Sequence, residues 1–405
     1  MHIAFFSNFY KPVINGVVRS ISSFRRELSK LGHNVFVFAQ TDSGYEDDEP
    51  FIFRYPSLPL PTQVKVPAVI PVSPFVDQLL PSLKLDVIHT HHPILLGQTA
   101  ANKAEALNLP LVFTFHTRYQ EYTHYIPLPQ EAIQEFLKDT VQTWLMDFMQ
   151  RCQHIVIPSK SMKEILVREY GLRDRFTVIP TGIDLEPYRH ADGKSFRSEM
   201  GWGNDKVLVT VGRLAKEKNM DTLLNAAEKA IQKHPDLRVV IIGDGPEKNA
   251  LQELTAELGI AERVTFTGEV PFSEIPSYLK AADIFGFAST TETQGLVTME
   301  ALAAGLPVIA VDASGTRDII QDGEQGYLVP DDADALAGSM MRMLESSEEL
   351  QKFKSKALAR AKDFDVKNCT KQLVDVYEQA IQDKADERFV SIEEERKEVR
   401  YAGAS

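Results

Sequence analysis

Two glutamates in the second half of the chain have the spacing and the surroundings of a ligand site. Glu292 and Glu300 lie on either side of Gly295, directly after an apolar run, Ile284–Ala288, that predicts a buried strand. The helix expected to open at Thr298 presents free backbone N–H groups and the positive end of its dipole to an anion. If the ligand is a nucleotide sugar, Glu292 can accept hydrogen bonds from sugar hydroxyls and Glu300 can hold the ribose diol. In the alternative, Glu300 only complements the dipole in the first helical turn.

Arg213 and Lys218 are the cations that such a ligand needs. Both follow another apolar run, Val207–Val211, that predicts a strand. A diphosphate leaving group gains negative charge in the transition state, and fixed cations beside it stabilise that charge. Surface cations after a strand are also common without any function, so this pair by itself does not identify a site.

A glycine near the N-terminus could bring backbone close to a phosphate. Gly16 follows Asn15 in a loop between the apolar run His2–Ser7 and an expected helix, Ser20–Leu31. Without a side chain, the backbone N–H groups at this point can approach an anion. A glycine before a helix is just as often only a turn, and both interpretations stay open.

Histidines crowd the first half of the chain, at positions His89, His91, His92, His116 and His124. A metal site is not expected from them, because side chains alternate in direction along a strand end and no nearby carboxylate set completes a coordination sphere. His116 is the better catalytic candidate, since it ends the apolar run that begins at Leu111 and so lies at the carboxyl end of an expected strand, where ligands bind.

The elements that must position these residues follow a repeated pattern of a short apolar run, a turn and an amphipathic segment, which is typical of parallel βαβ units. The expected strands of a first sheet are His2–Ser7, Val35–Ala39, Val87–Thr90, Leu111–His116 and Ile155–Pro158. The expected strands of a second sheet are Val207–Val211, Arg238–Ile242, Val264–Thr267, Ile284–Ala288 and Pro307–Val311. The expected helices are Ser20–Leu31, Gln98–Leu107, Glu131–Cys152, Met220–Lys233 and Glu247–Leu258. Ligands of such folds bind at the carboxyl ends of the strands.

The pattern lapses around Leu185–Asp205 and then restarts, which predicts two similarly built α/β domains joined by a linker. We expect an N-terminal domain over residues 1–190, a C-terminal domain over residues 191–380, and a solvated, charged tail over residues 381–405.

Composition and charge exclude several classes of protein. The chain has 405 residues, 43% of them apolar, which is enough for two cores. Its net charge of −13 argues against a general nucleic-acid binder. Residues 1–190 hold 18 Lys and Arg against 19 Asp and Glu, so this half is the one that could approach an anionic surface. We expect no signal peptide and no membrane span, and both Cys152 and Cys369 are expected to be buried thiols.

Taken together, these residues resemble the retaining glycosyltransferases of the GT-B fold. The E-x7-E motif of Glu292 and Glu300 is the most specific element. Four further segments match in order: Pro180–Asp184, Gly212–Lys218, Gly243–Pro246 and Phe266–Val270. The resemblance implies two facing Rossmann-like domains with parallel sheets, an acceptor-binding first domain, a donor-binding second domain and a transfer site in the cleft between them. It also implies a reaction without a covalent intermediate, a catalytic metal or another cofactor.

The resemblance further implies a role for each candidate residue. Arg213 and Lys218 would hold the diphosphate with a backbone contact from Gly16, and His116 would lie near the reacting carbon. The remaining donor contacts would come from Glu292 and the Gly295, Leu296 and Val297 backbone on the sugar, Glu300 on the ribose and Val270 beside the base.

A narrower similarity is to bacterial 1,2-diacylglycerol 3-glucosyltransferases, carried by His89–His91, Phe115–Tyr125 and Ser289–Leu296. It implies transfer of a hexose, glucose in the first instance, from a UDP-sugar to diacylglycerol in glycolipid synthesis. The enzyme would then be cytoplasmic and peripheral on the inner face of the cell membrane. Two alternatives remain: the same fold acting on a soluble acceptor, and a non-catalytic protein that binds a sugar nucleotide.

Overall fold

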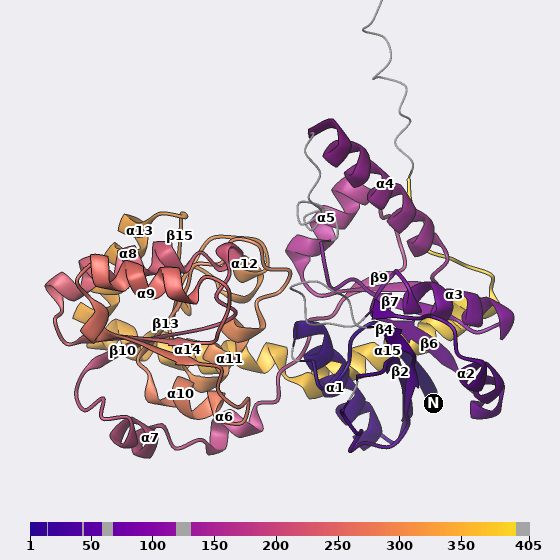
Figure 1. The fold of residues 1–405 in the computed structure, drawn as a ribbon, viewed down its shortest axis with the longest axis horizontal. Coiled ribbons are helices and arrows are strands. Elements are labelled where there is room, and N and C mark those ends of the chain that lie inside the picture. Colours follow the sequence, from indigo (N-terminus) through magenta and orange to yellow (C-terminus); the bar gives the residue numbers. More distant parts are fainter. Residues whose placement is uncertain (14, 43, 59–67, 119–130, 394–405) are drawn as a thin grey trace, which may run out of the picture. The chain divides into compact units, whose positions relative to one another are not determined.

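The computed structural model describes residues 1–13, 15–42, 44–58, 68–118 and 131–393, with the backbone alone over 131–138. Contacts within the chain divide it into two compact units. The first unit comprises Met1–Gly182 together with Cys369–Ser405, and the second comprises Ile183–Asn368. Each unit is built on its own parallel sheet (Figure 1).

The first unit contains a seven-stranded parallel sheet in the order β3-β2-β1-β6-β7-β8-β9. Its strands are β1 His2–Ser7, β2 Asn34–Gln40, β3 Ile52–Tyr55, β6 Val87–Thr90, β7 Leu111–Thr114, β8 His154–Ile157 and β9 Phe176–Val178, with β4 Ser57–Leu58 and β5 Ala68–Val69 paired separately. Its helices are α1 Gly16–Lys30, α2 Pro74–Leu79, η1 Leu80–Leu83, α3 Leu96–Ala106, α4 Glu131–Gln150, α5 Lys160–Tyr170 and, from Cys369 on, α15 Val366–Ala385.

Alternate residues of each central strand pack into different cores, because successive side chains point to opposite faces of a sheet. Phe6 of β1 packs on the face covered by α2, α3, α4 and α5. Phe5 packs on the other face, which α1 and α15 cover. The second half of α4 contributes Leu145, Phe148 and Met149 to the first of these cores.

The second unit contains a six-stranded parallel sheet in the order β12-β11-β10-β13-β14-β15. Its strands are β10 Lys206–Val211, β11 Leu237–Ile242, β12 Val264–Gly268, β13 Ile284–Phe287, β14 Val308–Val311 and β15 Gly326–Val329. Its helices are α6 Glu186–His190, α7 Gly193–Glu199, η3 Lys216–Lys218, α8 Met220–Lys233, α9 Lys248–Glu257, η4 Ala261–Arg263, α10 Ile275–Ala281, α11 Leu296–Ala304, α12 Thr316–Ile319, α13 Ala333–Glu345, α14 Ser347–Ala361 and η5 Lys362–Phe364.

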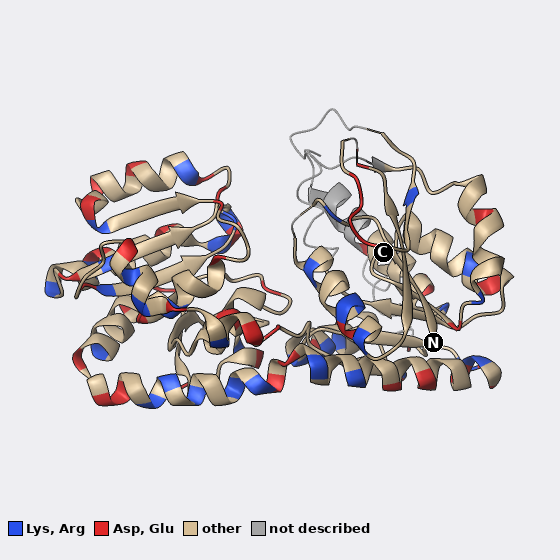
Figure 2. Ribbon diagram, turned by 90° about the horizontal axis from the view of Figure 1, so that it is seen from below, with Lys and Arg blue, Asp and Glu red and all other residues tan. Residues whose placement is uncertain are grey.

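Charged residues are rare on the strands of both sheets, whereas Lys or Arg and Asp or Glu are interspersed on the helices (Figure 2). This distribution is typical of all-parallel sheets, whose strands are covered on both faces. Because helices cover both faces of each sheet, a ligand can reach the strands through the loops at their ends.

The expected linker over Leu185–Asp205 is wrong. This segment forms α6 and α7, and Tyr188 and Trp202 are buried in the core of the second unit. A Cβ atom on Gly193 would lie 2.2 Å from the carbonyl oxygen of Lys280, so this glycine allows α7 to pack against α10. Gly193 thus serves close packing within the second unit.

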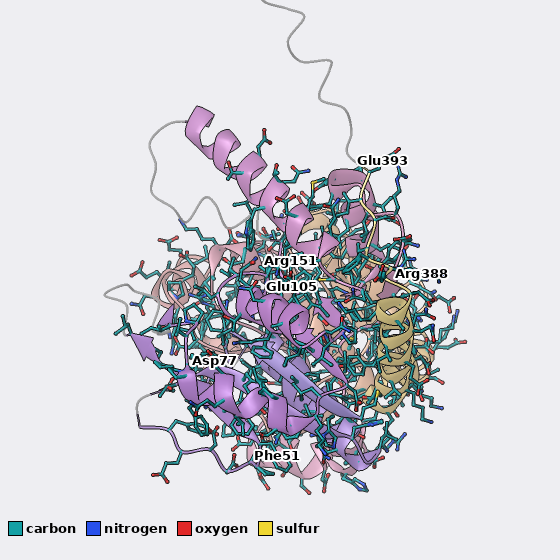
Figure 3. All side chains as sticks on the ribbon, turned by 90° about the vertical axis from the view of Figure 1, so that its right-hand side faces the viewer. Phe51, Asp77, Glu105, Arg151, Arg388 and Glu393 are labelled. Atoms are coloured by element: carbon teal, nitrogen blue, oxygen red, sulfur yellow. The ribbon has the colours of Figure 1, made fainter. Side chains whose placement is uncertain are left out.

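The expected tail begins too early, and the end of the chain belongs with the first unit. Helix α15 continues to Ala385, and Val390 is buried in the first unit's core. The backbone N–H of Glu393 donates to the carbonyl of Gly171, and the labels of Arg388 and Glu393 in Figure 3 mark this segment beside the unit. Apolar residues among the charges, above all Val390, hold the segment in place, whereas the charge run alone predicted a solvated end.

Candidate active site

Two loops of the second unit follow neighbouring strands at the point where the strand order reverses. The loop with Arg213 and Lys218 follows β10, and the loop with Glu292 follows β13. β10 pairs with β13 on one side and with β11 on the other. Ligands of open parallel sheets bind outside the carboxyl ends of the strands at such a reversal. The fold therefore brings the expected cations and the expected carboxylate to the carboxyl ends of two neighbouring central strands.

Glycines next to β11 allow the cationic loop to lie close to its neighbour. A Cβ on Gly243, which has φ +137°, would lie 2.0 Å from the carbonyl oxygen of Gly212. A Cβ on Gly245 would lie 2.3 Å from that of Leu214. The N–H of Leu214 donates to the carbonyl of Asp244 at 2.9 Å. The Gly-Asp-Gly run therefore supports the backbone that carries Arg213.

Lys218 and Glu292 form an ion pair between the loops that follow β10 and β13. The ammonium of Lys218 lies 2.5 Å from Oε1 of Glu292, and the hydroxyl of the buried Ser289 donates to the same oxygen at 2.8 Å. Both charged side chains are less than a quarter exposed. Arg213 is exposed, and among the described residues it has no salt bridge. The site thus holds one neutralised pair and one cation open to solvent.

Gly295 opens α11 in the left-handed conformation, with φ 75°. The side chains of Leu296 and Val297 pack against the core, so these residues offer a ligand their backbone at the start of the helix. The close packing of this loop also requires a glycine at position 315, because a Cβ on Gly315 would lie 2.6 Å from the carbonyl oxygen of Glu292. The loop is therefore fixed by close backbone contacts on both sides.

Glu300 lies in the second turn of α11 and is 1% exposed. No acidic residue occupies the first turn, so the alternative in which Glu300 complements the helix dipole there is wrong. Val270 follows β12 and packs partly buried against the same core as Leu296. The structure thus gathers all the candidate donor residues of the second unit around strand ends and α11.

The first unit contains the other two candidates, Gly16 and His116. Gly16 is exposed at the first position of α1, whose start is capped by Asn15: its Oδ1 accepts from the N–H of Val18 at 2.9 Å. His116 lies two residues beyond β7, because the strand ends at Thr114 and not at His116 as expected. Nε2 of His116 lies 3.0 Å from Nδ1 of His91.

The histidines around His116 are buried and uncharged. Desolvation lowers the pKa of His116 to about 3, and it lowers the pKa of His89 and His92 to about 3 as well, with a smaller contribution from His116. His89 is hydrogen bonded to the hydroxyls of Tyr377 and Thr114, at 2.8 Å and 2.7 Å. No group of three or more metal-ligating side chains occurs among the described residues. His124 and the part of the motif from Tyr119 to Tyr125 lie outside the described residues.

Three residues support the candidate residues through contacts that the sequence did not predict: Ser289, Gly315 and His91. Ser289 stood inside the quoted motif, but its contact with Glu292 needs the loop geometry. Gly315 carries no local signal for its packing against Glu292. His91 could have been found, because His89 and His91 are two residues apart and so share a strand face, where their rings lie 4.4 Å apart.

Comparisons with known proteins agree with this architecture. Residues 14–187 match the model of Glycosyltransferase Family 4, and residues 194–360 match Glycosyl transferases group 1. The alpha-monoglucosyldiacylglycerol synthase of Streptococcus pneumoniae is 33% identical over 86% of this chain and 80% of its own. The enzyme of the same name from Acholeplasma laidlawii is 32% identical over 80% of this chain and 84% of its own.

Solved structures share the fold. HepE of Anabaena in complex with UDP has a TM-score of 0.74 at 21% identity, covering 93% of this chain and 100% of its own. Sucrose-phosphate synthase of Thermosynechococcus elongatus has a TM-score of 0.76 at 21% identity, covering 94% and 99%. None of the helices described here has the length and apolar character to cross a bilayer. The chain belongs to the glycosyltransferases of the GT-B fold, with a Family 4 first half and a group 1 second half.

Proposed function

We propose that this glycosyltransferase transfers glucose from UDP-glucose to 1,2-diacylglycerol with retention of the anomeric configuration. Two relatives at 32–33% identity are named alpha-monoglucosyldiacylglycerol synthase, which supports both the hexose and the lipid acceptor. Solved structures of the same fold were determined with UDP and with UDP-glucose, which supports the donor class.

The contact between Lys218 and Glu292 is the observation that carries the proposal. A cation suited to a diphosphate and a carboxylate suited to sugar hydroxyls lie in contact at the carboxyl ends of neighbouring strands. When the donor binds, its diphosphate replaces Glu292 as the partner of Lys218 and also takes up Arg213. Glu292 is then free to accept hydrogen bonds from the sugar. The contact thus orients both side chains toward one ligand site.

The other donor contacts follow from the positions of the remaining residues. The Gly295, Leu296 and Val297 backbone at the start of α11 would bind the sugar, and Glu300 would hold the ribose diol. Val270, in the loop that follows β12, would lie against the base. Gly16 at the start of α1 would add a backbone contact to the diphosphate.

In the transfer step, the diphosphate leaves while the acceptor hydroxyl attacks from the same face of the sugar. The proton of that hydroxyl passes to the departing phosphate oxygen, so no side chain need act as nucleophile. Arg213 and Lys218 stabilise the charge that develops on the leaving group. His116 would lie near the reacting carbon as an uncharged hydrogen-bonding group. The step requires no metal and no other cofactor.

A lipid acceptor also implies work at a membrane surface, which we place on the inner face of the cell membrane. Exposed apolar side chains on the first unit suit this role: Leu58, Val72 and Phe75 are all more than half exposed. An acceptor with two acyl chains can be reached only where such a surface contacts the bilayer interface.

A screen of donors against acceptors with mass detection tests the proposal. The purified full chain is incubated with UDP-, GDP- and ADP-sugars and with diacylglycerol in mixed micelles, sugars or polyols. The expected product is monoglucosyldiacylglycerol from UDP-glucose, with an α anomeric proton by NMR and undiminished formation in EDTA. A glycosylated soluble compound as the only product would overturn the lipid acceptor, and a β linkage would overturn retention. UDP binding without transfer or hydrolysis would favour the non-catalytic alternative.

A further inference from the structure

His91 and His116 form a pair at adjacent strand ends of the first unit. His91 directly follows β6 and is 1% exposed, and His116 lies just beyond β7, which pairs with β6 in parallel. Nδ1 of His91 is 3.0 Å from Nε2 of His116, and the planes of the two rings are inclined by 25° with their centroids 5.3 Å apart. His91 has no place in the donor or acceptor contacts proposed above, yet it touches the only side chain assigned to the reacting carbon.

A hydrogen bond between two imidazole nitrogens needs one proton between them, so one ring donates and the other accepts. Burial, together with the neighbouring rings of His89, His116 and His92, holds the pKa of His91 well below its usual range. Both rings are therefore neutral, and each carries a single proton. Which ring donates decides which nitrogen of His116 carries a proton toward a ligand.

The nitrogen of His91 that does not contact His116 shows which of the two rings donates the hydrogen bond. Nε2 of His91 is buried, and no hydrogen-bond partner is found for it in the described part of the chain. The ring lies edge-to-face with Phe5 at 5.0 Å and beside His89. A buried N–H without an acceptor is rarer in proteins than an acceptor with a free lone pair. The proton of His91 therefore belongs on Nδ1, which donates to Nε2 of His116.

We infer that His91 is a positioning residue that fixes His116 in the tautomer with its proton on Nδ1. Nε2 of His116 is then occupied as an acceptor and cannot serve as a general base. His116 instead offers an N–H to a ligand oxygen, as suits a reaction in which the leaving phosphate takes the acceptor's proton. The link to catalysis rests on the proposed function, whereas the tautomer does not.

The surroundings of the pair keep this arrangement over a wide pH range. The titratable groups beside it are His89 on β6, His92 after β6 and, through His89, Tyr377 on α15. Burial raises the pKa of Tyr377 well above its usual value, so its hydroxyl stays protonated. No ion pair joins any of these groups to a carboxylate among the residues described. The tautomer of His116 should therefore not change between pH 5.5 and 8.

Nitrogen-15 NMR of the full chain labelled at histidine tests the tautomer without reference to any substrate. The His116 and His91 signals are assigned by their loss in His116→Gln and His91→Asn. We expect Nδ1 of both rings to be protonated and Nε2 of both to be bare at pH 7. A protonated Nε2 on His116 would overturn the inference, whatever the enzyme turns out to transfer.

Three variants test the positioning role through turnover. His91→Phe keeps an aromatic ring but loses the N–H that donates to His116. We expect kcat to fall about tenfold, with the KM for the nucleotide sugar unchanged. His91→Asn places an amide N–H near the position of Nδ1 and should restore most of kcat. His154→Phe is the matched control, because His154 is also a buried histidine of this sheet but is bonded to Thr177. It should leave kcat unchanged.

Thermal unfolding of each variant is measured beside its turnover, so that loss of folded protein is not taken for loss of positioning. Equal kcat in folded His91→Phe and in the parent, or equal loss in His91→Asn and His91→Phe, would overturn the inference. If the parent transfers no sugar while the NMR result holds, the proposed function fails and the His91 to His116 donation stands.

Discussion

The two units hold their candidate residues by opposite means. In the second unit, Lys218 and Glu292 are a charged pair with Arg213 exposed nearby. In the first, the half-buried His116 lies beside the buried histidines His89, His91 and His92, and desolvation keeps these rings uncharged. A diphosphate needs full charges that can exchange partners, whereas a group beside a reacting sugar needs a fixed proton. In the reaction that we propose, the second unit supplies electrostatic stabilisation and the first supplies orientation.

The largest expected effect comes from removing a charge on the second unit. Lys218→Ala should lower kcat with UDP-glucose about a hundredfold, or about 3 kcal/mol in barrier, because the developing charge of the diphosphate loses a cation. Lys216→Ala is the matched control, since Lys216 is an exposed lysine of the same short helix. Steady-state kinetics of both variants measure the effect. Equal kcat for Lys218→Ala and Lys216→Ala would contradict electrostatic stabilisation of the diphosphate by the second unit.

A smaller effect is expected from disturbing the support of the cationic loop. Gly243→Ala would place a Cβ against the carbonyl oxygen of Gly212 at a positive φ, so we expect the free energy of unfolding to fall by about 2 kcal/mol and kcat to fall with it. Gly201→Ala separates the two causes, because Gly201 also has a positive φ but nothing lies within 4 Å of the added atom. It should cost about 1 kcal/mol and leave kcat unchanged. Urea unfolding and kinetics provide both quantities.

The smallest effect concerns the uncharged histidines of the first unit. The pKa of His89 is about 3 in the folded chain and about 6.5 when unfolded, so between these values the unfolded chain binds more protons. The contribution of neutral His89 to the free energy of unfolding is complete above about pH 6.5. It falls as the pH decreases, by at most about 1.4 kcal/mol per pH unit.

Urea unfolding from pH 7 to pH 5.5 measures this slope. His89→Asn should reduce the slope even if it lowers the stability itself, whereas His190→Gln should not, because the His190 side chain is 81% exposed. A slope that is the same in the parent and in His89→Asn would contradict a buried, neutral His89.

The sequence predicts the elements better than it predicts the contacts between them. β1 His2–Ser7 and α8 Met220–Lys233 have the bounds expected from their periodicity. The expected strands end within two residues of the observed ones, so the placement of Arg213 and Glu292 in strand-end loops follows from local pattern. The pairing of Lys218 with Glu292, 74 residues apart, does not, because it depends on β10 and β13 being neighbours in the sheet.

The same limit explains the errors. The packing of Trp202 and the close approach at Gly193 turn an apparent linker into part of a domain. The return of α15 to the first unit, where Tyr377 meets His89, joins residues 288 positions apart. Local sequence carries no signal for contacts of that separation, whereas strand and helix periods extend over a few residues only.

A crystal structure of the full chain with bound UDP-glucose tests the central claim most directly. We predict that the diphosphate lies within hydrogen-bond distance of Arg213 and Lys218, that Lys218 has left Glu292, and that Glu292 binds the sugar. A nucleotide bound away from these three side chains, with the ion pair of Lys218 and Glu292 intact, would contradict the account.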